Sequence, residues 1–372
     1  MNDHDRFGVY VHIPFCTSRC DYCAFATWTD RHHLLGDYVT ACVESARRQL
    51  DGSRPATSVF FGGGTPSLLE PEHLAAILGA IPRIADAEVT VECNPETVDG
   101  AKLAGYRDAG ASRLSFGVQS MASHVVAGLG RRHDPDGARQ AVVAAGETGF
   151  GDRYSIDLIM GGAGESTADW ATTLDEVVAL DPPPRHISAY GLTVEPGTPL
   201  AADRARHPDP DDQADKYLHA EERLTAAGLR WYEISNWARP GSECEHNQLY
   251  WRQGEYLGIG CAAHSHRVDS ETGWARRWWN VRTPDRFIRM VATGEDVTAA
   301  GEDLDPSARR LEALELALRT SSGVAEDALP GWATDPALVE LVEPIGDGRV
   351  RLTVQGRLLA NEVTLRLQST AS

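Results

Sequence analysis

The sequence has no long apolar run and no excess of basic residues. No window approaches the roughly 18 consecutive apolar residues of a membrane-spanning helix, and residues 1–6 lack the apolar stretch of a signal peptide. Lysine and arginine (35) are outnumbered by aspartate and glutamate (54), giving a net charge of −19. This balance argues against a nucleic-acid partner, because phosphate binding needs clustered basic side chains. Seven cysteines, three of them closely spaced, fit a reducing compartment better than a disulfide framework, so we expect a cytoplasmic protein.

The three closely spaced cysteines are Cys16, Cys20 and Cys23, directly after a strand-like run at 8–15. Most [4Fe–4S] clusters take four cysteine thiolates, one per iron. Position 25 is Phe25, so this motif supplies only three thiolates and would leave one iron open, as a catalytic zinc site leaves one position open. A zinc knuckle or a redox pair is the alternative, but zinc needs a fourth ligand at its own spacing.

Up to about residue 234, short β-branched and aromatic runs alternate with amphipathic stretches. The predicted strands are 8–14, 57–61, 87–92, 112–117, 153–158, 185–190 and 229–234. The predicted helices are 31–50, 71–80, 99–109, 121–146, 166–180 and 211–227. Such alternation indicates an α/β fold with a parallel sheet, either a barrel or a doubly wound sheet. The absence of a GxGxxG turn favours an incomplete (β/α)6-type barrel.

The pattern changes after residue 234, and we predict three domains. These are a partial barrel (1–234), an aromatic-rich segment (235–300) and a small C-terminal α+β module (301–372). Within the first, the charged run 203–210 is predicted to be an exposed loop, and a linker is predicted near 291–306. The expected elements of the tail, a winged-helix-like module, are helix 306–319, helix 336–342, a hairpin around 346–348 and helix 355–363.

A run of three glycines, followed by Thr65 and Pro66, ends the second predicted strand. Glycine lets the backbone approach a ligand closely, although a tight βα turn would use the same residues. Beside CxxxCxxC, the run resembles the S-adenosylmethionine (SAM) loop of the radical-SAM superfamily. In that superfamily the open iron binds the amino and carboxylate groups of SAM, and an electron from the cluster splits its sulfonium. The residues that this resemblance assigns to SAM are Tyr10, Tyr22, Gly63, Gly64, Thr65, Glu92, Gln119, Arg131 and Asp157.

Glu92 and Asp157 are assigned because they end predicted strands, and the carboxyl ends of barrel strands form the active-site face. Tyr10 and His12 share one strand face, because side chains alternate along a strand, and are expected to point toward the cavity of Cys16. A buried histidine with satisfied hydrogen bonds is the alternative for His12.

A second distinctive segment, residues 244–251, reads CEHNQLYW, and six of nine tryptophans fall between 231 and 279. Aromatic clusters usually mean core packing. The same region also supplies side chains that a large flat ligand with carboxylates would need, including arginines for the carboxylates and an axial nitrogen. These side chains are Arg239, Arg252, Arg276, Arg277, His264 and His266. A porphyrin fits this description.

Over nearly its whole length the chain resembles the coproporphyrinogen dehydrogenase-like branch of radical-SAM proteins, and within it the haem chaperones. The resemblance rests on segments 10–16, 62–66, 92–95, 115–120, 157–159 and 352–363, and on HNxxYW at 246–251. The dehydrogenases carry a further cysteine where this chain has Phe25. The chain departs from the chaperone pattern at Ala24, at the loop 161–164 and at Cys261.

The resemblance implies a [4Fe–4S] cluster on the three cysteines, bound SAM, and haem bound by His246, Asn247, Tyr250 and Trp251. The expected function is to bind haem and deliver it to haem-requiring respiratory proteins, with the membrane surface as one place of delivery. One alternative is an oxygen-independent coproporphyrinogen III dehydrogenase, which decarboxylates two propionates oxidatively. The other is a related radical-SAM methyltransferase with a second SAM as methyl donor. Phe25 and HNxxYW favour the chaperone.

Overall fold

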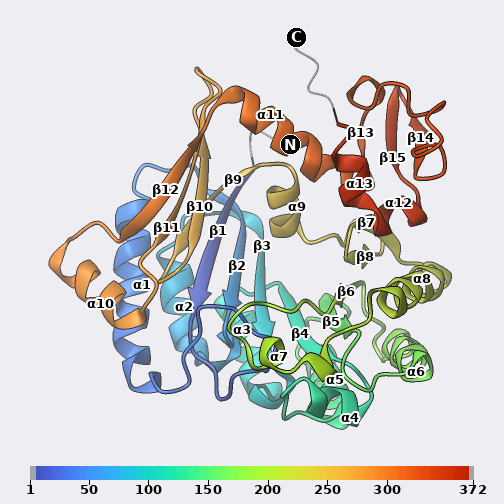
Figure 1. Ribbon diagram of the computed structural model, residues 1–372. Helices are drawn as coiled ribbons and strands as arrows, with labels where there is room; N and C mark the ends of the chain where they lie inside the picture. Colours follow the sequence, from blue (N-terminus) through green and yellow to red (C-terminus); the bar gives the residue numbers. More distant parts are fainter. Residues whose placement is uncertain (1–5, 368–372) are drawn as a thin grey trace.

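A twelve-stranded sheet organises the protein, for which a computed structural model describes residues 6–367 (Figure 1). Its order is β12-β11-β10-β9-β1-β2-β3-β4-β5-β6-β8-β7. The first six strands are β1 (Phe7–Ile13), β2 (Ala56–Gly63), β3 (Arg83–Cys93), β4 (Arg113–Gln119), β5 (Tyr154–Met160) and β6 (His186–Gly191). Each pairs in parallel with the next, so their carboxyl ends lie at one edge. The predicted α/β fold with a mostly parallel, open sheet is confirmed.

Helices connect these strands, as expected for parallel pairing. They are α1 (Leu35–Gln49), α2 (Pro71–Gly79), α3 (Gly100–Ala109), α4 (Ser123–Gly128), α5 (Pro135–Glu147), α6 (Thr167–Val178), α7 (Pro199–Ala202) and α8 (Pro210–Ala226). The 3-10 turns are η2 (His32–Leu34), η3 (Pro66–Leu68), η4 (Pro95–Thr97), η5 (Arg204–Arg206) and η6 (Glu326–Ala328). The single helix predicted at 121–146 is wrong: Gly130, at φ 75°, ends α4, and the following loop carries Arg131.

The remaining strands extend both ends of the same sheet. They are β7 (Arg230–Glu233), β8 (Asn236–Ala238), β9 (Glu255–Ile259), β10 (His264–Val268), β11 (Ala275–Asn280) and β12 (Thr298–Leu304). β9 is parallel to β1, whereas β10 to β12 are antiparallel. The strand predicted at 229–234 is therefore present, but it forms a hairpin with β8, which pairs antiparallel with β6.

The predicted linker near 291–306 is wrong. Its residues form the end of α10 (Pro284–Thr293) and the whole of β12. β12 is an edge strand of mostly exposed small and acidic residues, and edge strands commonly carry charge, so its sequence looks like a loop. The exposed loop predicted at 203–210 contains η5 and the start of α8.

The C-terminal module has its own antiparallel sheet, β13-β15-β14, and its own buried core, which includes Leu318, Val350 and Val363. Its elements are α11 (Pro306–Leu318), β13 (Val324–Ala325), β14 (Val342–Gly346), β15 (Arg349–Leu352), α12 (Val354–Leu358) and α13 (Ala360–Thr364). The predicted hairpin is confirmed as β14–β15. The helix predicted at 336–342 is wrong, because turns lead there into β14, and the helix predicted at 355–363 is two short helices.

A partly buried ion pair connects the C-terminal module to α8. Arg357 donates to both carboxylate oxygens of Glu221, at 2.6 and 3.0 Å, and its guanidinium lies 4.1 Å from the ring centre of Trp231. Two parallel bonds and an aromatic face suit the planar guanidinium. We infer that this contact fixes the module against β7 and α8.

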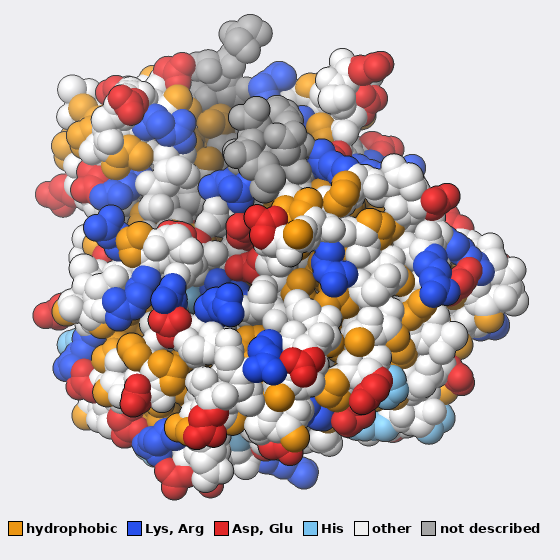
Figure 2. Space-filling view, turned by 180° about the vertical axis from the view of Figure 1, so that it is seen from behind, with side chains coloured by type: hydrophobic (Ala, Val, Ile, Leu, Met, Phe, Trp, Pro, Cys, Tyr) orange, Lys and Arg blue, Asp and Glu red, His pale blue; other side chains and the backbone are white. Residues whose placement is uncertain are grey.

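Figure 2 shows basic and acidic side chains interspersed over the back of the molecule, without a large field of one sign. None of the helices within residues 6–367 is both long and apolar enough to span a membrane.

Candidate functional site

The loop after β1 carries the three motif cysteines and is tied back to the end of that strand. The amide of Cys16 donates to the carbonyl of Trp28 at 3.1 Å, and the amide of Trp28 donates to Pro14 at 2.8 Å. His32 hydrogen-bonds the carbonyl of Cys16 at 2.9 Å. Cys16 is buried, whereas Cys20 and Cys23 are partly exposed. The loop therefore carries three thiols on a segment whose two ends are hydrogen-bonded to each other.

The glycine turn after β2 lies directly against this loop. The amides of Gly64 and Thr65 donate to the carbonyls of Ile13 and Phe15, both at 2.8 Å. A Cβ on Gly64 would lie 2.7 Å from the Phe15 oxygen and 3.0 Å from the sulfur of Cys16. Gly63 has φ 112° and donates to Glu92 at 3.1 Å. Only glycine permits this close approach of the turn to the cysteine loop.

Two partly buried carboxylates lie at the carboxyl ends of β3 and β5. Asp157 accepts hydrogen bonds from Ser115 at 2.9 Å and Ser188 at 2.8 Å. Glu92 accepts the Gly63 amide. Burial, and then the nearby charge of Asp157, raise the pKa of Glu92 from 4.5 to about 7. Burial also raises the pKa of Asp157. These carboxylates can accept hydrogen bonds from hydroxyl groups such as those of a ribose.

Arg131 reaches the same region from the loop after α4. It donates to Asn94 at 2.6 Å and to the Tyr22 hydroxyl at 3.2 and 3.3 Å. Its charge partly offsets the effect of burial, which raises the pKa of the Cys20 thiol. Gln119 adopts φ 67°, an unusual conformation for a residue other than glycine. Such strain is common where the backbone serves a ligand.

One cavity of about 510 Å³ joins these residues. It is lined by Cys16, Cys20, Cys23, Tyr22, Gly63, Gly64, Thr65, Glu92, Gln119, Arg131 and Asp157, that is, by every residue predicted for the cluster or SAM except Tyr10. The sequence reasoning did not assign Asn94 and Tyr190, which also line it. Asn94 belongs to the strand-end segment ECNP, so its position after β3 was a usable signal. The loop 161–164, where the chain departs from the chaperone pattern, does not line it.

The donor set and the glycine turn fit a [4Fe–4S] cluster with SAM beside it. Three thiols line one cavity together with the glycine turn and the two carboxylates. Within residues 6–367, however, no three histidine, cysteine or acidic side chains already stand close enough together to hold a metal ion. Cysteine binds as the thiolate, so binding would release protons from these thiols. The remaining thiols, Cys42, Cys93, Cys244 and Cys261, are buried, in keeping with the expectation of small core residues.

Tyr10 lines a second cavity, of about 660 Å³. Its hydroxyl hydrogen-bonds His12 at 3.1 Å, and the other ring nitrogen of His12 bonds the Ala26 carbonyl at 2.9 Å. Burial lowers the pKa of His12 to about 4, so it is the buried, satisfied histidine considered as the alternative. Ala24 and Phe25 line both cavities, which are therefore neighbours.

The HNxxYW segment forms α9 (Glu245–Trp251), whose two sides make different contacts. His246 is buried, and its ring nitrogens hydrogen-bond Ser58 and the Tyr250 hydroxyl, both at 2.9 Å. Its ring stacks on Phe60 and Tyr10. Burial lowers the pKa of His246 to about 3, so the ring is neutral. Tyr250 also lines the second cavity, whereas His246 does not.

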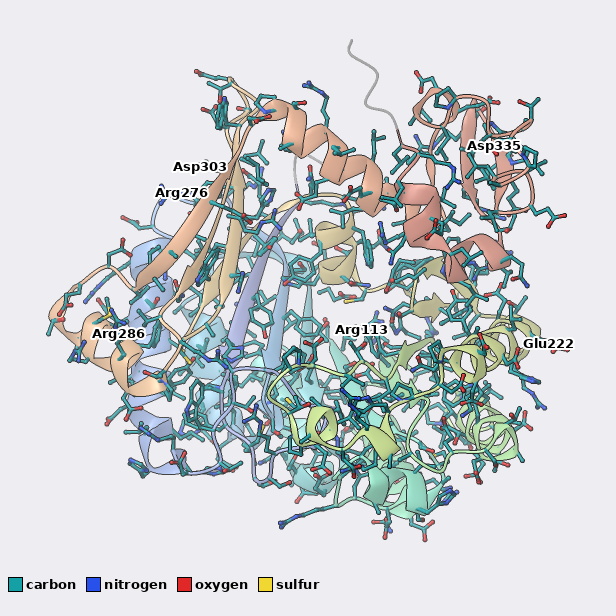
Figure 3. The ribbon with its side chains drawn as sticks, in the orientation of Figure 1. Arg113, Glu222, Arg276, Arg286, Asp303 and Asp335 are labelled. Atoms are coloured by element: carbon teal, nitrogen blue, oxygen red, sulfur yellow. The ribbon has the colours of Figure 1, made fainter. Side chains whose placement is uncertain are left out.

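The other two signature residues face β7. Asn247 donates to the Tyr232 hydroxyl at 3.1 Å and to Glu233 at 2.9 Å. Trp251 lines a separate pocket between this hairpin and the C-terminal module. The start of α9 is held by Glu88, which accepts the Glu245 amide at 2.8 Å and pairs with Arg113, near the middle of Figure 3. The structure thus gives the signature a packing role and does not gather its four residues around one cavity.

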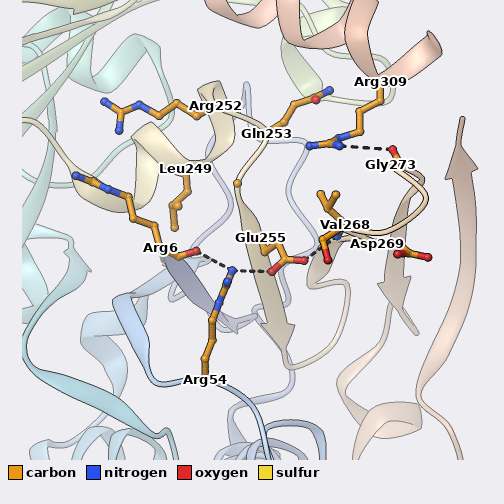
Figure 4. A pocket seen from close by; sticks show the side chains of 12 residues that line it. Arg6, Arg54, Leu249, Arg252, Gln253, Glu255, Val268, Asp269, Gly273 and Arg309 are labelled. Carbon is orange, nitrogen blue, oxygen red and sulfur yellow. Dashed lines mark hydrogen bonds and ion pairs between the residues drawn. The ribbon is translucent and has the colours of Figure 1, made fainter. Parts of the chain in front are cut away.

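The arginine-rich pocket in Figure 4 lies at the other end of β1. Arg54 bridges the carbonyl of Arg6 at 2.9 Å and the carboxylate of Glu255 at 2.6 Å. Glu255 pairs with Phe7 at the amino ends of β9 and β1. This pocket is therefore remote from the carboxyl-end edge that carries the cysteines.

A pH-dependent stability follows from Glu92. Because its folded pKa is raised to about 7, the folded state holds a proton that the unfolded state releases near pH 4.5. The free energy of unfolding should therefore fall as pH rises from about 4.5 to about 7, by an amount on the order of 3 kcal/mol. Glu92→Gln should lack this decrease and exceed the wild-type melting temperature above pH 7 in ligand-free protein. The exposed Glu147→Gln is the control, and parallel curves for Glu92→Gln and wild type would contradict the prediction.

Comparison with known proteins identifies the family of the chain. The radical-SAM superfamily model matches residues 10–177. A Mycobacterium tuberculosis protein named heme chaperone HemW is 39% identical and aligns with 97% of this chain and 94% of its own. The Escherichia coli heme chaperone HemW is 34% identical, over 96% of each chain.

A solved structure shares the fold. Coproporphyrinogen III oxidase (HemN) from Escherichia coli, described as a radical SAM enzyme, superposes with a TM-score of 0.81 over 98% of this chain and 90% of its own. The two are 22% identical, so this likeness speaks for the fold alone. The sequence relatives decide the family: the chain belongs to the HemW heme chaperone family of radical-SAM proteins.

Proposed function

We propose that the protein binds haem and delivers it to haem-requiring proteins, respiratory enzymes among them. The observation that carries this is Phe25, whose side chain is 65% exposed between the two cavities. The dehydrogenases that this chain resembles carry a cysteine at that point. Here an exposed apolar ring takes its place, which suits contact with a flat apolar ligand better than metal binding or redox chemistry.

In this proposal Cys16, Cys20 and Cys23 hold a [4Fe–4S] cluster. Bound there, the cluster supplies an electron and an open iron to SAM. The turn at Gly63 to Thr65 holds the methionine end of SAM, and the guanidinium of Arg131 binds the carboxylate of SAM. Glu92 and Asp157 accept hydrogen bonds from the ribose hydroxyls. Tyr22, which already bonds Arg131 at 3.2 Å, keeps that guanidinium oriented toward the cavity.

The proposed haem region includes α9. His246, Asn247, Tyr250 and Trp251 are the residues expected to support haem binding. Tyr250 lines the second cavity, and His246 stacks on Tyr10, which lines it too. We infer that the signature holds this cavity wall in place, because His246 and Asn247 have buried hydrogen bonds on two different sides of α9.

The test is an anaerobic comparison of two assays on the reconstituted protein. We expect haem to bind with a shifted Soret band and to pass to an apo-haemoprotein such as apomyoglobin. With SAM and reductant, coproporphyrinogen should yield no protoporphyrinogen. Several turnovers of coproporphyrinogen per chain would reject the chaperone function in favour of the dehydrogenase. Authentic HemN is the positive control for the second assay.

A further inference from the structure

The second cavity is walled by one face of the sheet extension. Side chains alternate along a strand, so Tyr256 on β9, His264 and His266 on β10, and Arg277 and Trp279 on β11 share this face. All but His266 line the cavity. Arg276 and Asp303, labelled in Figure 3, are register partners on the opposite face. We call the cavity-lining residues Tyr256, His264, Arg277 and Trp279 the β-platform.

His264 differs from the other histidines near this cavity. Its side chain is exposed, and no hydrogen bond to its ring occurs among residues 6–367. The ring stacks on Trp279 with centroids 5.4 Å apart and planes at 25°. His266 is buried and bonds the Gly254 carbonyl at 3.0 Å, and both nitrogens of His12 are bonded. Partial desolvation of the ring, and then the charge of Arg277, lower the pKa of His264, which keeps a nitrogen lone pair available.

His246, which the family resemblance assigns to haem binding, is in the opposite state. Its side chain is 1% exposed, and it would have to break bonds to Ser58 or Tyr250 before it met an iron atom. A Cβ on Gly8 would lie only 2.9 Å from its ring, so strand β1 packs closely against it. A buried hydrogen-bonded group is costly to strip of its partners. His264 needs no such rearrangement.

Among residues 6–367, the charges around the β-platform leave one unpaired guanidinium for a carboxylate of the ligand. Arg282 lines the cavity, is exposed and makes no ion pair with any residue from 6 to 367. Arg277 also lines it, and pairs with Glu302 at 3.1 Å and Glu312 at 2.7 Å. A free guanidinium beside an imidazole and aromatic rings is the combination that a metalloporphyrin requires.

The size and the position of the second cavity fit a porphyrin. Ligand sites commonly enclose about 300–1,000 Å³, and this cavity measures about 660 Å³. Phe25 supplies an exposed apolar ring at its rim, shared with the cysteine cavity. Ala262, which also lines it, adopts φ 56°, a conformation that L residues rarely take and that is common near ligands.

We propose that the porphyrin lies on the β-platform, with the iron on the imidazole of His264 and a propionate on Arg282. This inference rests on the proposed haem function and goes beyond it, because it assigns the axial position to one residue, His264 on β10, and not to the histidine of the HNxxYW segment. The porphyrin would then touch Phe25 and lie next to the proposed SAM cavity. A ligand in the SAM cavity would then be placed to influence the release of the porphyrin.

The test is a titration of the anaerobically reconstituted full chain with ferric haem, followed by absorption and electron paramagnetic resonance. His264→Ala should lose the imidazole-ligated spectrum and weaken binding at least about tenfold, and added imidazole should restore the Soret position. Arg282→Gln should weaken haem and metal-free protoporphyrin alike, by about tenfold, with the ligation spectrum unchanged. His264→Ala should leave metal-free protoporphyrin nearly unaffected, because that ligand has no iron.

Matched histidine variants complete the design. His124→Ala changes an exposed histidine on α4 and should leave the titration unchanged. His246→Gln should lower the melting temperature but keep the imidazole-ligated spectrum. A wild-type protein that binds no haem would reject the proposed function itself. Haem binding with an unaltered spectrum and affinity in His264→Ala would overturn this inference alone.

Discussion

Replacing Cys16, Cys20 or Cys23 by alanine should abolish most of the cluster in anaerobically reconstituted protein. The wild type should hold about four iron and four sulfide per chain, which three thiolates anchor at three irons. Removing one thiolate leaves a second iron without a protein ligand, and two thiolates hold a cluster of this charge and size poorly. Iron and sulfide analysis, with electron paramagnetic resonance of the reduced protein, measures the loss.

The matched controls are Cys42→Ala and Cys261→Ala. Both thiols are fully buried, and burial raises their pKa, so they are poor metal ligands. Each variant should keep its full iron content, although Cys261→Ala removes a hydrogen-bond acceptor from Tyr38. Stoichiometric zinc in the wild type, with no iron uptake on reconstitution, would contradict the cluster.

Gly64→Ala should abolish SAM binding while the chain still folds. The added Cβ would meet two backbone carbonyl oxygens at 2.7 and 2.8 Å and the Cys16 sulfur at 3.0 Å, and none of these is the flexible end of a side chain. The glycine turn must move away from the cysteine loop, which opens the cavity where the methionine end would bind. We expect an affinity loss of at least about a hundredfold.

The signal for this test is the change that SAM causes in the spectrum of the reduced cluster. Wild-type protein should show it at saturating SAM, and Gly64→Ala should not. Gly79→Ala, at the end of the following helix, is the control, because its Cβ would contact nothing within 4 Å and should leave SAM binding intact. An unchanged wild-type spectrum would mean that the fourth iron position is closed. A normal SAM response in Gly64→Ala would show that the turn does not hold the ligand.

The strands that the sequence predicted best are those that are buried and alternate with amphipathic helices along the chain. Strands β1 to β6 have buried apolar side chains on both faces, so β-branched runs between amphipathic helices were enough to locate them. The prediction failed at the edges. β12 consists mostly of exposed small and acidic residues, so its own sequence carries no strand pattern, and it is a strand because it pairs with β11. The region 336–342 contains Leu338 and Leu341, but these side chains pack into the C-terminal core from turns.

The sequence alone located the three cysteines and the glycine run, because both are local patterns. Three thiols lie within eight residues, and three consecutive glycines indicate close backbone contact. Tertiary structure alone decided which histidine is available to a ligand. His246 lies in a distinctive motif, yet β1 and β2 bury it and satisfy both its nitrogens. His264 lies in no recognised motif. The pairing of β10 with β11 leaves its ring exposed and stacked on Trp279, with no hydrogen-bond partner among residues 6–367. Availability depends on what the fold places around a side chain, and neighbours distant in sequence set it.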